Sequence, residues 1–98
     1  MDVIIKVELN GKYVTGAEAE EYRQLCGVLH SGFQPYYEDS DISRGYAQWF
    51  LKGLPDDTDL ATIKAAIGSV SKRKFDHQKM ANGYMIRAGL LDQSGGTN

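Results

Sequence analysis

Cys26 and His30 stand four residues apart, the spacing that lets two side chains on one helical turn share a metal ion or pair a thiol with its base. The chain has no second cysteine, and its other histidine, His77, belongs to a distant segment. A buried free cysteine usually behaves as a small hydrophobic residue. Asp56 and Asp57 are better explained as caps of a helix than as an acid–base pair. We therefore expect no enzyme active site, no metal site and no cofactor.

Cations gather in the last third of the chain, beginning with Lys72-Arg73-Lys74. Residues 1–63 carry eleven acidic and five basic residues, a net charge of −6, whereas residues 64–98 carry two acidic and six basic residues, a net charge of +4. An acidic body with a basic end suits a protein that meets a polyanion with one face. The alternative is that the acidic and basic segments pair with each other inside the fold.

Size and composition predict one domain over residues 1–92, followed by a flexible tail at 93–98. Apolar residues make up 42% of the 98 residues and charged residues 24%, which are ordinary globular values. No apolar run approaches the ~20 residues needed to span a bilayer. The first residues, MDVIIKVEL, do not resemble a signal peptide, and a single cysteine forms no internal disulfide, so we expect a cytoplasmic protein.

A β-hairpin is predicted at residues 2–14. Val3, Ile5 and Val7 alternate with polar residues, and Asn10-Gly11 is the favoured pair for a two-residue hairpin turn. A lone hairpin is marginal in water, so this one should lie on the helices that follow. Its exposed edge is a candidate interface for a homodimer.

Three helices are expected next, at about residues 16–30, 41–53 and 58–68. Each has an apolar stripe with a period of three to four residues. The stripes are, in order, Tyr22, Leu25, Cys26 and Leu29; Ile42, Tyr46, Trp49 and Phe50; Leu60, Ile63 and Ile67. The expected caps are Thr15 with Glu18 for the first helix, Ser40 or Asp41 for the second, and Asp57 or Thr58 for the third, with Asp59 in its first turn.

Residues 32–41 are predicted to form a loop in which aromatic side chains lie beside carboxylates. Such a loop can bind a protein partner, because tyrosine combines a large contact area with a polar tip. The candidate partner-binding residues are Phe33, Tyr36, Tyr37, Glu38 and Asp39. The preferred interpretation is that Phe33 and one tyrosine fold back over the core.

A fourth helix, at about residues 72–88, completes the predicted α+β fold of an N-terminal hairpin followed by about four helices. Ser71 is its expected cap, and the basic run lies in its first turns. Asn82-Gly83 leaves an alternative open, because this pair can instead divide the segment or turn it into a hairpin.

With these elements, residues 43–92 resemble the winged helix-turn-helix class of DNA-binding domains, in which the last helix lies in a groove of DNA. The helices at 43–54, 58–68 and 71–88 match the three helices of the class. The resemblance implies a DNA-binding transcription regulator that contacts double-stranded DNA through its last helix. The implied contacts are Lys72, Arg73, Lys74 and Lys79 to phosphates, and His77, Gln78 and Asn82 to base edges.

A second hypothesis is a small accessory or inhibitor protein, of the kind that phages and other mobile elements encode. Such a protein would bind another protein through the acidic and aromatic surface at residues 33–41. The two hypotheses depend on opposite ends of the charge distribution, so substitutions in each region distinguish them.

Overall fold

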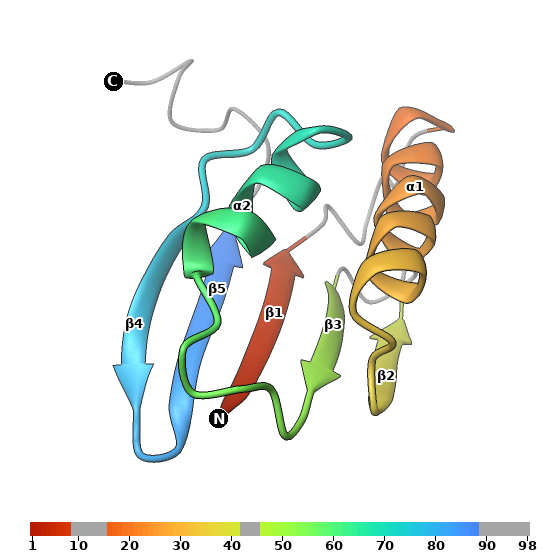
Figure 1. Ribbon diagram of the computed structural model, residues 1–98. Helices are drawn as coiled ribbons and strands as arrows, with labels where there is room; N and C mark the ends of the chain where they lie inside the picture. The colour runs from red at the N-terminus through yellow and green to blue at the C-terminus, as the bar shows by residue number, and fades with distance from the viewer. Residues whose placement is uncertain (9–15, 42–45, 89–98) are drawn as a thin grey trace.

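A computed structural model describes residues 1–8, 16–41 and 46–88. The described chain forms two helices and one five-stranded mixed sheet (Figure 1). The strands are β1 (Asp2–Glu8), β2 (Tyr37–Asp41), β3 (Tyr46–Leu51), β4 (Asp76–Met80) and β5 (Gly83–Ala88), in the order β2-β3-β1-β5-β4. The helices are α1 (Gly16–Gly32) and α2 (Leu60–Gly68). The fold is α+β, but the prediction of a hairpin followed by four helices is wrong.

Strand β1 lies in the middle of the sheet. It pairs antiparallel with β3 and parallel with β5, so both of its edges are occupied. Val3, Ile5 and Val7 are fully buried, as their alternation predicts. The predicted hairpin at 2–14 is therefore wrong in its pairing, and β1 offers no free edge for a second copy; residues 9–14 lie outside the described chain.

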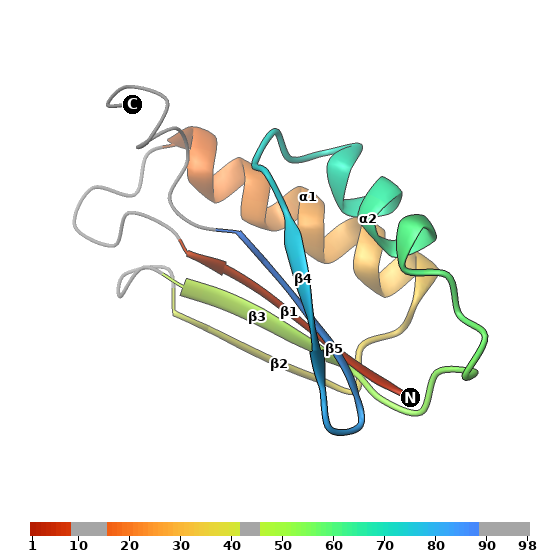
Figure 2. The same ribbon diagram turned by 90° about the vertical axis from the view of Figure 1, so that its left-hand side faces the viewer.

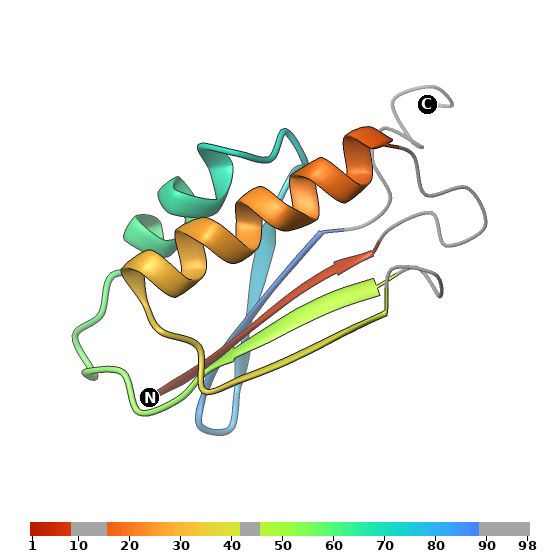
Figure 3. The same ribbon diagram turned by 90° about the vertical axis from the view of Figure 1, so that its right-hand side faces the viewer.

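Both helices cover the same face of the sheet, and the other face carries no helix (Figures 2 and 3). Helix α1 confirms the predicted helix at 16–30 and buries Leu25 and Leu29. Its expected cap, Thr15, is not among the described residues. Helix α2 buries Ile63 and Ile67. Its cap is Asp59, which accepts a hydrogen bond from the Ala61 amide at 2.9 Å, and not Asp57 or Thr58 as expected.

Strand β3 replaces the helix predicted at 41–53. Ala47, Trp49 and Leu51 are buried and alternate with half-buried residues, which is a period of two. The aromatic-rich sequence of this segment suits a strand that is buried on one face. The sequence predicts a helix here because Tyr46, Trp49 and Phe50 also fit a helical stripe, although Trp49 lies on the opposite face of the strand from the other two.

A hairpin of β4 and β5 replaces the helix predicted at 72–88. Met80 is the register partner of Gly83, so Ala81 and Asn82 form the connecting turn. An ideal Cβ at Gly83 would lie 1.7 Å from the Asp2 carbonyl oxygen, so the β1–β5 pairing requires glycine here. Since the segments 43–54 and 71–88 provide strands where the winged helix-turn-helix class has helices, the described chain has no helix-turn-helix arrangement.

Candidate nucleic-acid interface

The residues predicted to contact DNA are divided between a connection, a strand and a turn. Lys72 and Lys74 are exposed in the connection from α2 to β4, and Arg73 between them is buried. His77, Gln78 and Lys79 are exposed on β4, and Asn82 is exposed in the β4–β5 turn. Alternation along β4 puts Gln78 on the opposite face of the sheet from its two neighbours. The structure therefore does not bring all seven residues together.

Arg73 belongs to a buried ion-pair cluster and is not a surface cation. Its side chain is 1% exposed, and its Nε donates to both carboxylate oxygens of Glu21 at 2.9 and 3.1 Å. Further bonds reach Glu18 Oε2 at 3.4 Å and the Glu8 carbonyl oxygen at 3.0 Å. Ser71 Oγ also donates to Glu21, at 2.5 Å. The prediction that Arg73 contacts phosphate is not supported by this geometry, because its guanidinium is already held by carboxylates inside the protein.

We use the name basic edge for five cationic residues of α2, β4 and their connection: Lys72, Lys74, His77 and Lys79, which are exposed, and Lys64, which is half-buried. Lys64 Nζ lies 2.9 Å from His77 Nδ1, which joins α2 to β4. Tyr84 on β5 lies beside two of them, with its ring edge-to-face to His77 at 5.8 Å between centroids and the Lys79 ammonium 5.5 Å from its centroid. Register agrees with this grouping, since His77 and Lys79 share the face of Ile86 and Tyr84.

Among the described residues, the lysines of the basic edge are not paired with carboxylates. From residue 64 to residue 88 the chain carries six basic residues and a single acidic one, Asp76. Asp76 is the register partner of Arg87 on the opposite face of the sheet from His77. Within the described chain, no carboxylate forms an ion pair with any of the four lysines of the basic edge. A positive surface next to an aromatic ring is therefore available to a ligand.

The predicted partner-binding loop is partly a strand, because residues 37–41 form β2 at the edge of the sheet. Phe33 packs against the core, as preferred for this segment. Tyr36 is 72% exposed, which is unusual for so large a side chain. Glu38 is half-buried and bonded to α1, while Tyr37 and Asp39 are placed only by their backbone register with β3. Tyr36 is thus the exposed member of the set whose side chain the structure describes.

Cys26 and His30 do lie on one face of α1, but Glu38 of β2 lies between them. Its Oε2 is 3.3 Å from Cys26 Sγ, its Oε1 is 3.1 Å from His30 Nε2, and the Tyr22 hydroxyl also donates to it. Burial, together with the Glu38 carboxylate, raises the pKa of the Cys26 thiol, although the Tyr22 hydroxyl opposes the shift. The arrangement disfavours a thiolate, so it does not resemble an activated nucleophile.

Protonation of Glu38 should make stability depend on pH. Burial favours its neutral form, but hydrogen bonds from Tyr22, His30 and Cys26 outweigh burial and lower its pKa below the ordinary value. A lowered folded-state pKa adds stability above the unfolded-state pKa of about 4.3, and this stability is lost as the pH falls through the folded-state value. We expect Glu38→Gln to flatten the fall in unfolding free energy below about pH 4.3. Urea denaturation at several pH values measures this effect.

The control for this experiment is Glu20→Gln, which removes a carboxylate from the exposed face of α1, where it pairs with Arg23. The control should keep the acid-dependent loss of stability seen in the unsubstituted protein. If the unfolding free energy of Glu38→Gln and of the unsubstituted protein depended on pH in the same way, the hydrogen bonds to Glu38 would not contribute to stability.

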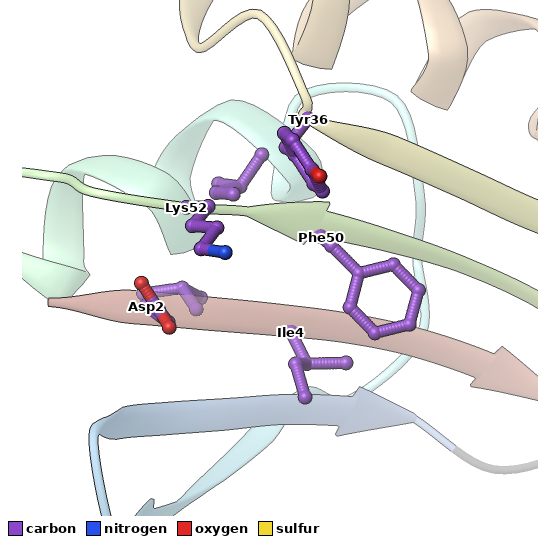
Figure 4. A pocket seen from close by; sticks show the side chains of 7 residues that line it. Asp2, Ile4, Tyr36, Phe50 and Lys52 are labelled. Atoms are coloured by element: carbon purple, nitrogen blue, oxygen red, sulfur yellow. The ribbon is translucent and has the colours of Figure 1, made fainter.

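One hollow on the uncovered face of the sheet combines Tyr36, a predicted partner-binding residue, with residues that were not predicted to belong to a site. It has a volume of about 270 Å³ and lies among Tyr36, Phe50, Ile4, Lys52 and Asp2, whose side chains are shown in Figure 4. Ile4 is the register partner of both Phe50 and Met85, so these three residues form an apolar row across the uncovered face. Alternation in β1 was the available signal, because residues between buried Val3 and Ile5 must face the other way.

Comparisons with protein-family models, with curated proteins and with solved structures find no match. The function must therefore be argued from the surface itself. Within residues 1–8, 16–41 and 46–88, no three His, Cys, Asp or Glu side chains are placed to hold a metal ion. No helix of the same residues is long and apolar enough to cross a bilayer.

Proposed function

We propose that the protein binds nucleic acid through the basic edge. The supporting observation is that α2, its connection to β4, and β4 itself carry four lysines and a histidine, with Lys64 bonded to His77 and with His77 and Lys79 against the ring of Tyr84. Lysine ammonium groups bind phosphates, and release of condensed counterions drives such binding. The protein would use an edge strand and its preceding connection, not a recognition helix. A regulatory role in the cytoplasm is part of the proposal.

A salt titration tests this proposal. Each phosphate neutralised contributes about −0.7 to −0.9 to the slope of log affinity against log salt. We expect salt-sensitive binding of DNA between about 50 and 200 mM salt, and a slope shallower by about 1.4 to 1.8 for Lys72→Ala/Lys74→Ala. Both side chains are exposed, so the double variant should fold normally. Fluorescence anisotropy of labelled DNA gives the affinities.

The matched control is Arg23→Ala, which removes an exposed cation from α1, where it pairs with Glu20. It should leave the salt slope unchanged. Binding that is absent at low salt, or that weakens equally in the control and the lysine variant, would refute a role for the basic edge.

A second candidate function, an accessory or inhibitor protein that binds another protein, is favoured by the apolar row on the uncovered sheet face. A half-buried apolar centre with a polar rim is common to protein interfaces. A partner recovered with the unsubstituted protein and lost on Met85→Lys would support this candidate. Arg87 and Lys6 at the rim of the row are controls, because alanine at either position keeps the apolar centre.

A further inference from the structure

Two hollows lie on the uncovered face of the sheet, one beside Tyr36 and the other at the β4–β5 turn. The hollow beside Tyr36 and Phe50 is followed by a second one of about 180 Å³, and the two share Asp2 and Ile4 as lining residues. The second hollow is also lined by Met80, Asn82 and Tyr84. The second hollow ends at strand β4, whose opposite face carries His77 and Lys79 of the basic edge.

The first hollow has the chemistry of a stacking site for a planar ring. Tyr36 is largely exposed and Phe50 is half-buried, so the Tyr36 ring offers aromatic surface to a ligand. The Lys52 ammonium lies 5.1 Å from the centroid of the Tyr36 ring and supplies a cation beside it. Asp2 is the only carboxylate that lines either hollow among the described residues, and its Oδ1 accepts a hydrogen bond from the Gly53 amide at 3.0 Å. A ligand that combines a planar ring with negative charge fits this arrangement.

We infer that the nucleic acid bound by this protein is single-stranded, and that one of its unpaired bases stacks in the hollow formed by Tyr36 and Phe50. This inference rests on the proposed function and specifies its ligand. Aromatic side chains hold bases of any sequence by stacking, while a positive surface follows the backbone. In a duplex the bases are stacked on each other and cannot enter the hollow. The phosphates of the same strand would lie on the basic edge, with Lys52 beside the stacked base.

The test uses the full chain and two probes, a fluorescein-labelled oligothymidylate and its duplex with oligoadenylate. We expect the single strand to bind at least about tenfold more tightly than the duplex at equal salt. Tyr36→Ala should weaken single-strand binding by about 5- to 150-fold, which corresponds to the usual 1 to 3 kcal/mol for loss of one stacked base. Its salt slope should stay unchanged, because no cation is lost. Tyr36→Phe keeps the ring and should bind as the unsubstituted protein does.

The outcomes separate this inference from the function on which it rests. Equal affinity for the two probes, or single-strand binding by Tyr36→Ala as tight as that of the unsubstituted protein, would overturn the stacking site. The Lys72→Ala/Lys74→Ala variant would still test the basic edge in that case. Absence of binding to both probes at low salt would overturn the proposed function itself. Photo-crosslinking of an oligonucleotide that carries iodouracil gives a second readout, and attachment to the peptide with Tyr36 or Phe50 is the expected result.

Discussion

Replacement of Arg73 by alanine is expected to destabilise the protein by about 3 to 5 kcal/mol, the usual cost of removing one partner of a buried ion pair. The guanidinium joins the connection before β4 to two carboxylates of α1, Glu18 and Glu21. Both carboxylate side chains are largely buried, with exposed fractions of 9% for Glu18 and 11% for Glu21. Without Arg73 both carboxylates would remain desolvated and would lose the cation that they share, which is the expensive part of the change. Urea denaturation with fluorescence of Trp49 measures the loss.

The neighbouring cations provide the control for Arg73. Lys72→Ala and Lys74→Ala remove exposed ammonium groups and should change the unfolding free energy by no more than about 0.5 kcal/mol. An Arg73→Ala variant as stable as these two would contradict the buried cluster. If Arg73→Ala lost nucleic-acid binding, the cause would be unfolding of the protein and not loss of a phosphate contact. Arg73 is therefore unsuitable for testing the binding surface.

Replacement of Gly83 by alanine is the second substitution with a large expected effect. The added Cβ would lie 1.7 Å from the carbonyl oxygen of Asp2 and less than 3 Å from two more of its backbone atoms. Backbone atoms cannot rotate away as a side chain can, so β5 must move away from β1. The expected cost is about 3 kcal/mol, the upper end of the usual overpacking penalty. Thermal and urea denaturation measure this destabilisation.

Gly27→Ala is the matched control for Gly83→Ala. Gly27 is an exposed residue of α1, and an added Cβ there meets nothing within 4 Å. Alanine should stabilise this helix by roughly 0.5 to 1 kcal/mol. If residues 72–88 formed the helix that their sequence suggested, alanine at Gly83 would also be stabilising. Opposite signs for the two glycines therefore distinguish the β4–β5 hairpin from that helix.

The elements that could be predicted from the sequence are those in which the apolar residues recur with the period of a strand or of a helix. Strand β1 alternates strictly, and α1 and α2 have regular apolar stripes. Strand β4 has no such pattern, because all but the last of its residues are exposed at the edge of the sheet. Its conformation depends on pairing with β5, which in turn depends on β1, more than 80 residues earlier in the chain at Asp2 and Gly83. Local propensity cannot report pairing over that distance.

The same limit applies to the candidate site. Lys72, Arg73 and Lys74 look alike in the sequence, and the inward position of Arg73 depends on two glutamates about fifty residues away. Here the alternative interpretation of the charge asymmetry, that acidic and basic segments pair internally, accounts for one of the three cations. The hollow beside Tyr36 draws its lining from β1, β3 and the residue before β2, so no single stretch of sequence indicates it.

The most direct test of nucleic-acid binding is a backbone-amide NMR titration of the protein with oligothymidylate. We expect the largest shift changes along the basic edge, at residues 64, 72, 74, 77 and 79, and around the hollow at residues 36, 50 and 52. The amide shifts of the outer face of α1, which includes Arg23 and Gly27, should stay unchanged. Shift changes confined to α1, or none at low salt, would contradict nucleic-acid binding through the basic edge.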